Sequence, residues 1–274
     1  MSNREGGWEL PISEGELSRL TSEMRDAHEA TLPVMHASAR DMVEGLFDLK
    51  RTGTEPEPEQ PSFLGRRGFL IGAGASAAML ALAACGGGDT DIKAAAPSPS
   101  ASPGAGRYTG DLKVVALAAA LENQAVGAYQ AALAAAKAGK LGTVPPAVAT
   151  FAETAMSQHR DHAEAWNAIL AAAGRPKITG TPLSNHDDVV KALGQVKDVP
   201  GVAKLALQLE DQATQTYVFA TFNVTNMDGV NTAATIAPVE AMHSAILHFV
   251  LGQYPVPDDF VRTDKAASPD LLTV

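Results

Sequence analysis

Two segments of the chain, residues 121–129 and 209–217, repeat each other and constrain the fold more than any other feature. They read LENQAVGAY and LEDQATQTY, and five of their nine positions are identical, including a glutamate and a tyrosine. Both lie in long stretches rich in alanine and leucine, which favour helix. A second pair of matching positions, His162 and His243, is separated by nearly the same length of chain. The sequence therefore predicts two similar pairs of helices.

Helical signals after Arg107 predict an all-α fold. We expect four long helices at residues 111–140, 146–173, 200–223 and 231–252. A polar connection between the second and third carries a short helix near residues 187–194. Four long helices with one long middle connection are typical of a bundle of the crossover type. Residues 253–274 are expected to form an extended C-terminal tail.

Six side chains on these helices have the pattern of a metal site. Single glutamates stand on the first and third helices, and pairs three residues apart stand on the second and fourth: Glu122, Glu210, His159 with His162, and Glu240 with His243. Residues three apart share one face of a helix, so each pair can point into the bundle together. Charged side chains seldom lie in such apolar helix faces without a partner.

Over residues 110–252 the chain resembles the ferritin-like superfamily. That resemblance implies a four-helix bundle with the long crossover between helices 2 and 3. It also implies one inward Glu on each of two helices and a Glu-x-x-His on each of the other two, around two metal ions. By position, Glu122 and Glu210 match the single glutamates, Glu240 with His243 matches one full motif, and His162 matches the histidine of the other.

One position departs from the family pattern, because His159 stands where the second motif has its glutamate. Four carboxylates balance two divalent cations, whereas three leave a pair of cations one charge short. Asp161 and Glu164 do not replace the missing carboxylate, since they project away from the His159–His162 face at about 100° per residue. Iron is the expected metal, as a di-iron or a mononuclear site, and Mn, Zn and Cu stay open because imidazole suits later transition metals.

Several aromatic and histidine side chains are expected to support this site or the core. Tyr129 and Tyr217 lie seven residues after their glutamates, two turns along the same face, and should hydrogen-bond groups behind the metal ligands. His248 is turned away from His243 and should pack or lie at the surface. The aromatic residues expected in the core are Phe151, Trp166, Phe219, Phe222 and Phe249.

Composition and charge limit the remaining chemistry. The chain has one cysteine, Cys85, which excludes an intramolecular disulfide and any site that needs several thiolates. A net charge of -10 at pH 7 argues against nucleic acid as a partner. The sequence also lacks a dinucleotide-binding fingerprint, a phosphate loop and a serine nucleophile elbow.

Residues 66–85 resemble a twin-arginine export signal that ends in a lipoprotein box. Arg66 and Arg67 precede Phe-Leu, an uncharged Gly/Ala-rich run and the sequence Leu-Ala-Ala-Cys ending at Cys85. The run is short for a membrane span, although an uncleaved anchor stays open. The resemblance implies the export machinery as a partner, lipidation at Cys85 and tethering to the extracytoplasmic face of the cell membrane. The Pro-, Ser-, Ala- and Gly-rich residues 86–109 should be a disordered linker.

Residues 1–65 form an acidic extension before the signal. Apolar residues recur there at helical spacing, interrupted by Pro33, so we expect one or two amphipathic helices on the cytosolic side. His28 and His36 are expected to be solvated surface histidines. If Cys85 is processed, the extension is removed with the signal, and if it is retained, it is a cytosolic interaction element.

Three functions stay open on the sequence alone. The first is metal binding with oxidase or peroxide-detoxifying activity, and the second is a non-catalytic metal-binding surface protein. The third is a metal-free helical bundle that serves as an interaction module of the cell envelope. Self-association into a homo-oligomer also stays open, whereas a mineral-storing shell fits poorly with a lipid tether.

Overall fold

The computed structural model describes residues 8–52, 107–255 and 261–274. In chain order the elements are α1 (Glu14–Thr52), α3 (Asp111–Lys137), α4 (Pro146–Ala172), α5 (His186–Gln195), α6 (Val199–Asn223), α7 (Met227–Val250) and the short 3-10 helix η1 (Pro269–Leu271). The described residues contain no strand, and only an isolated bridge joins Leu183 to Leu272. The predicted all-α fold is confirmed, whereas Arg66, Arg67 and Cys85 lie outside the described residues.

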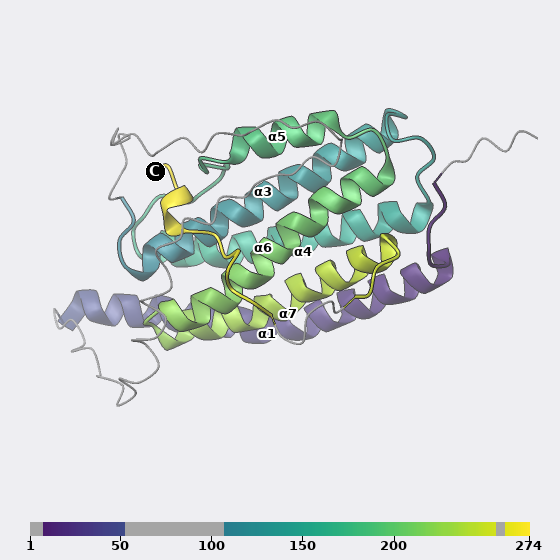
Figure 1. The fold of residues 1–274 in the computed structure, drawn as a ribbon. Coiled ribbons are helices and arrows are strands. Elements are labelled where there is room, and N and C mark those ends of the chain that lie inside the picture. The colour runs from purple at the N-terminus through teal and green to yellow at the C-terminus, as the bar shows by residue number, and fades with distance from the viewer. Residues whose placement is uncertain (1–7, 53–106, 256–260) are drawn as a thin grey trace, which may run out of the picture.

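The helices after residue 107 form two packed pairs. Helix α3 packs along α4, and α6 packs along α7, with α3 and α6 meeting between the pairs. Helix α5 belongs to the long connection from α4 to α6 and runs alongside α3 on the outside of the bundle, where it also contacts α6 (Figure 1). The predicted crossover between the second and third long helices is therefore present.

Capping residues explain where these helices begin and end. The Asp198 side chain accepts a hydrogen bond from Gly201 N at the start of α6. Asn226 does the same for two backbone N–H groups at the start of α7, so α7 begins four residues earlier than predicted. After α3 the backbone turns at Gly139, whose φ of 71° favours glycine, and the helix ends three residues before the predicted boundary.

Helix α1 packs along α4 and α7 as part of the same body as the bundle (Figure 1). It is a single helix of 39 residues that continues through Pro33, so of the one or two helices expected here the structure has one. Pro33 itself is exposed. Four apolar side chains of α1 are fully buried against the bundle: Leu17, Met24, Met35 and Met42.

Two further expectations about burial are wrong. His28 is only 3% exposed, because it lies on the side of α1 that packs against α4. His36, eight residues later, is exposed as expected. Phe222 is 62% exposed, since it lies one residue before the end of α6, where the helix leaves the core.

The C-terminal residues 261–274 are extended for most of their length, as expected, but they pack against the bundle. Lys265 N donates to Gln215 Oε1 at 2.8 Å and Ala267 N donates to Thr216 Oγ1 at 2.8 Å, which ties the tail to α6. Ala267 is 2% exposed. The tail therefore covers part of the outer face of α6.

Helix α7 is the one described helix that is long and apolar enough to cross a membrane. It also carries Glu240 and His243, which are both fully buried within the bundle. A core helix of a water-soluble bundle has the same length and composition, so this property does not indicate a membrane span.

Candidate metal centre

Six ionisable side chains meet in the interior of the bundle, one or two from each of α3, α4, α6 and α7. They are three glutamates and three histidines, all at most 2% exposed: Glu122, His159, His162, Glu210, Glu240 and His243. The structure thus brings together all six side chains that the sequence predicted as metal ligands. Burying this many ionisable groups is costly unless they neutralise one another or bind a cation.

The six side chains form two overlapping groups of four. Within each group, one possible ligand atom from every residue lies within 4.8 Å of the others. His159 and Glu240 belong to both groups. Glu122 and His162 complete the first group, and Glu210 and His243 complete the second. Two cations bound in these two groups would lie next to each other and would have to share His159 and Glu240 as ligands.

His159 lies at the middle of the centre. Its Nδ1 is 2.7 Å from Glu122 Oε2, and its Nε2 is 3.1 Å from Glu210 Oε1. The imidazole therefore spans the two single glutamates with both ring nitrogens. A carboxylate at this position could bridge two cations, whereas a neutral imidazole offers a lone pair to only one.

His162 and Glu240 approach each other without a hydrogen bond. His162 Nδ1 lies 2.9 Å from Glu240 Oε1, yet both atoms are buried and neither has a hydrogen-bond partner. The two atoms form a close ion pair, and without an aligned hydrogen bond it compensates only part of their lost hydration. Both atoms are good ligands for a divalent transition-metal cation, so the donor set at this position fits a metal.

His243 is oriented by a residue that the sequence did not single out. Its Nδ1 is 3.2 Å from both Glu210 Oε2 and Glu240 Oε2, while its Nε2 lies 2.7 Å from Gln158 Oε1. Gln158 is 2% exposed. A histidine that binds metal through one ring nitrogen commonly donates the other N–H to such an acceptor, which fixes the ring.

The two tyrosines of the repeat hydrogen-bond to the glutamates, but each bonds to the glutamate of the other repeat. Tyr129 OH donates to Glu210, and Tyr217 OH donates to Glu122. This exchange follows from the antiparallel alignment of α3 and α6, which sets each tyrosine opposite the other helix's glutamate. Trp166 Nε1 in turn donates to Tyr217 OH at 3.0 Å. The centre therefore has a hydrogen-bonded outer layer on two sides.

Electrostatics in the centre favour ionised carboxylates and protonated imidazoles. Burial by itself would raise the pKa of Glu122, but His162 and His159 outweigh it and lower that pKa to about 2. Burial opposes charge on His162 as well, yet Glu122 and Glu240 raise its pKa to about 9. The pKa values of His159 and His243 are raised for the same reason. Without a bound cation, three imidazoliums balance three carboxylates, so metal binding must displace protons.

Both tyrosines remain protonated at neutral pH. Burial, and then the carboxylate that each phenol faces, raise the pKa of Tyr129 and Tyr217 well above the usual 10.0. Each phenol therefore acts as a hydrogen-bond donor to its glutamate.

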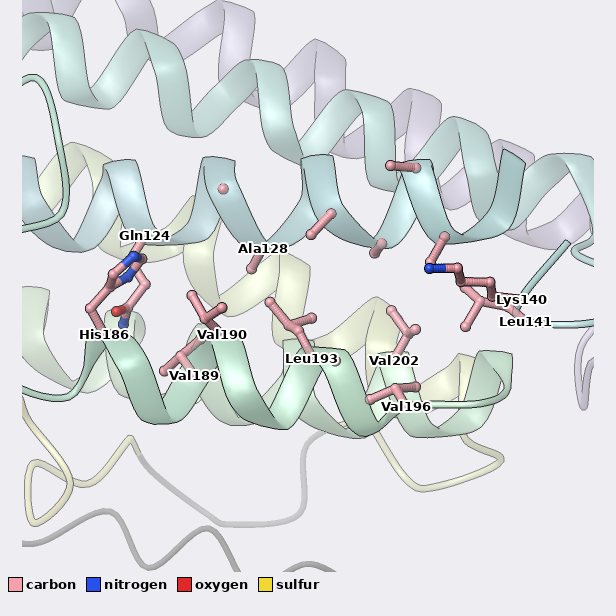
Figure 2. A pocket seen from close by; sticks show the side chains of 16 residues that line it. Gln124, Ala128, Lys140, Leu141, His186, Val189, Val190, Leu193, Val196 and Val202 are labelled. Atoms are coloured by element: carbon pink, nitrogen blue, oxygen red, sulfur yellow. The ribbon is translucent and has the colours of Figure 1, made fainter. Parts of the chain in front are cut away.

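A cavity of about 540 Å³ lies between α3 and α5, and none of the six candidate ligands lines it. Figure 2 shows its apolar walls, with Gln124 and His186 at one end and Lys140 at the other. A narrower apolar crevice of about 10 Å³ shares Ala128 and Leu193 with this cavity and reaches Tyr129 and Glu210. The narrow crevice has room for about one water molecule between the cavity on the α5 side and the centre.

A family model described as a ferritin-like domain matches residues 105–253, just over half of the chain. No curated protein and no solved structure matches the chain. The matched range begins before α3 and ends after α7, so it covers all four helices that supply the centre.

Proposed function

The chain belongs to the ferritin-like domain family, and from that premise we propose that it binds a transition-metal ion among the three glutamates and three histidines inside its bundle. The observation that carries the proposal is the pair of overlapping four-residue groups, whose ligand atoms lie within 4.8 Å of one another in the buried interior. Carboxylates and imidazoles together suit iron, zinc, manganese and copper.

Charge balance favours one divalent ion per chain. In the first group, Glu122 and Glu240 neutralise a divalent cation, and His159 and His162 complete four ligands. Glu210 and protonated His243 then remain as an ion pair, so the centre is neutral. A second divalent ion would leave one excess positive charge in a buried site, and would have to share His159 and Glu240 with the first. Binding of a second ion therefore requires an added anion.

The proposed metal is iron, and the proposed activity is oxidation of a small substrate or removal of peroxide. A redox-active metal with an open coordination position supplies this chemistry when bound. The crevice beside Tyr129 and Glu210 has room for about one water molecule, so a small oxidant that enters there must displace its apolar walls. Tyr129 holds a proton on the oxygen that faces the centre.

Metal analysis of the purified chain tests the binding proposal. We expect about one equivalent of metal in the wild-type protein and a large loss in Glu240→Gln, because Glu240 belongs to both groups and the amide keeps its size. The matched control is Glu164→Gln, which makes the same change at an exposed position of α4. A wild-type protein that folds but takes up no iron, zinc, manganese or copper would refute the proposal and favour a metal-free interaction module.

Turnover separates the catalytic proposal from simple metal binding. The iron-loaded wild-type protein should consume peroxide or oxygen faster than the Glu240→Gln variant supplied with the same iron. Equal rates in the two proteins would leave a non-catalytic metal-binding protein.

We also propose that the bundle is exported and tethered to the cell membrane through Cys85. The support is the order of Arg66, Arg67, the apolar run and the Leu-Ala-Ala-Cys sequence. A Cys85→Ser variant should move from the membrane fraction to the soluble fraction, and the wild-type mature N-terminus should be a lipid-modified Cys85 by mass spectrometry. A mature chain that still carries residues 1–84 without a lipid would refute this proposal.

A further inference from the structure

We infer that α1 helps to form the metal centre, because its His28 is a positioning residue that fixes the side-chain orientation of the candidate ligand His162. The inference rests on the proposed metal binding and extends it to a segment outside the matched family range, which starts at residue 105. In the chain that retains residues 1–84, it makes the metal-competent unit a five-helix body rather than the four helices that supply the ligands.

Helix α1 forms the wall of the centre along the seam between α4 and α7. The backbones of α4 and α7 barely touch, and α1 packs extensively against both. Figure 1 shows α1 running beside α7 along one edge of the bundle. The side chains of His162 on α4 and Glu240 on α7 meet beneath this seam, so α1 separates that part of the centre from solvent.

Contacts along the whole helix hold α1 in the seam. Near its start, Glu14 Oε2 accepts a hydrogen bond from Ala147 N at 3.2 Å, at the first turn of α4. Farther along, Ser38 Oγ and Thr232 Oγ1 of α7 share a buried hydrogen bond of 2.9 Å. Met24 packs in one core cluster with Phe151, whose ring lies edge-on to His243 at 6.4 Å. Helix α1 is thus fixed in register with the ligands.

His28 touches the centre directly. Its ring lies edge-on to the ring of His162, with the centroids 5.2 Å apart and the planes at 61°. His28 is 3% exposed, its Nε2 is buried without a hydrogen-bond partner, and Asp161 Oδ2 lies 3.9 Å from that nitrogen. Because this nitrogen makes no hydrogen bond, packing contributes to holding the His28 ring in place. The His28 ring fills the space into which the His162 ring would otherwise turn.

Holding the His162 ring matters because its Nδ1 must face Glu240. His159 is kept in place by hydrogen bonds to two glutamates, and His243 by hydrogen bonds that include the one its Nε2 donates to Gln158 Oε1. The Nδ1 of His162 forms an ion pair with Glu240 at 2.9 Å but no well-aligned hydrogen bond. Packing against His28 therefore adds to this ion pair in fixing the orientation of the His162 ring.

The test compares His28→Ala and His28→Phe in the full chain, with His36→Ala as the control at an exposed position of α1. Co²⁺ is the probe, because its visible spectrum reports ligand geometry. We expect His28→Ala to release Co²⁺ about ten- to a hundredfold faster and to shift the spectrum, as loss of an orienting neighbour does at other metal sites. His28→Phe restores a ring of similar shape and should recover the wild-type rate and spectrum. His36→Ala should match the wild-type protein.

Each other outcome has one meaning. A His28→Ala protein with a lower melting temperature but an unchanged Co²⁺ spectrum and release rate would show a structural role only and overturn the inference. A His28→Phe protein as impaired as His28→Ala would also overturn it, because ring packing would then not be the cause. A wild-type protein that binds no Co²⁺, iron or zinc would instead refute the proposed function itself.

Discussion

Replacing His159 by glutamate should convert a centre for one divalent ion into a centre for two. The substitution restores the fourth carboxylate at the position where both ring nitrogens of His159 contact glutamates, at 2.7 Å and 3.1 Å. Four carboxylates neutralise two divalent cations, and a carboxylate can bridge them where a neutral imidazole cannot. We expect about one equivalent of metal in the wild-type protein and about two in His159→Glu.

The same change should make folding depend on metal. In the wild-type protein without metal, three imidazoliums balance three carboxylates, whereas the variant would bury four carboxylates with two imidazoliums. Removing one partner of a buried ion pair typically costs about 3–5 kcal/mol. For a chain of this size each kcal/mol lowers the melting temperature by about 2–4 °C. His159→Glu in excess chelator should therefore melt roughly 6–20 °C below the wild-type protein, and added metal should remove most of the difference.

The assay combines metal analysis with thermal unfolding in chelator and in excess Fe²⁺ or Zn²⁺. The matched control is His36→Glu, which makes the same substitution at an exposed position and should change neither stoichiometry nor the effect of chelator. A wild-type protein that already holds two ions would refute the charge-balance argument. A variant that melts in chelator at the wild-type temperature would refute the claim that His159 neutralises the buried glutamates.

Three further results are expected. The metal-free protein should lose stability as pH rises from 6.5 to about 9, because folding raises the pKa of His162 to about 9. It should also lose stability as pH falls from 4.5 to about 2, because folding lowers the pKa of Glu122 to about 2. Denaturant titration across pH checks this, and a metal-loaded protein should not show the alkaline loss. Tyr217→Phe leaves a buried carboxylate with one donor fewer and should cost about 1–3 kcal/mol of unfolding free energy in urea titrations, whereas no change would mean that the phenol is dispensable. Gln158→Leu frees the His243 ring and should weaken Zn²⁺ binding about ten- to a hundredfold in competition titrations, with unchanged affinity as the contrary result.

The ligands of the centre could be predicted from sequence because both signals, helix periodicity and the internal repeat, can be recognised within single helices. Glu122 and Glu210 are charged residues in apolar stretches of helix, and the repeat makes them equivalent. The tyrosine partners could not be predicted in the same way. The seven-residue spacing gives only the distance along one helix, whereas the bond from Tyr129 to Glu210 depends on how α3 and α6 are aligned.

Gln158 and His28 were missed for different reasons. Gln158 is an uncharged amide beside His159, and nothing in the sequence distinguishes it from other glutamines on the same helices. His28 lies in a helix whose pattern is that of an ordinary amphipathic helix. Its burial arises from a contact with a segment more than a hundred residues away, which no local pattern encodes.

The position of α1 requires α1 and the bundle to lie on the same side of the membrane for the two to stay packed. Helix α1 and the bundle are joined through residues 53–106, which contain Arg66, Arg67 and Cys85. An export signal leaves the segment on its N-terminal side in the compartment of synthesis and carries the C-terminal segment across the membrane. If Cys85 directs export as proposed, one molecule cannot have both a packed α1 and an exported bundle.

Export of the bundle across the membrane would therefore require α1 to separate from α4 and α7. The four fully buried apolar side chains of α1 represent roughly 6–12 kcal/mol of burial, which opposes that step. Copies that stay behind keep five helices and a closed centre. Copies that cross would present at the cell surface a long apolar seam, of the kind that proteins cover with a partner or a lipid bilayer.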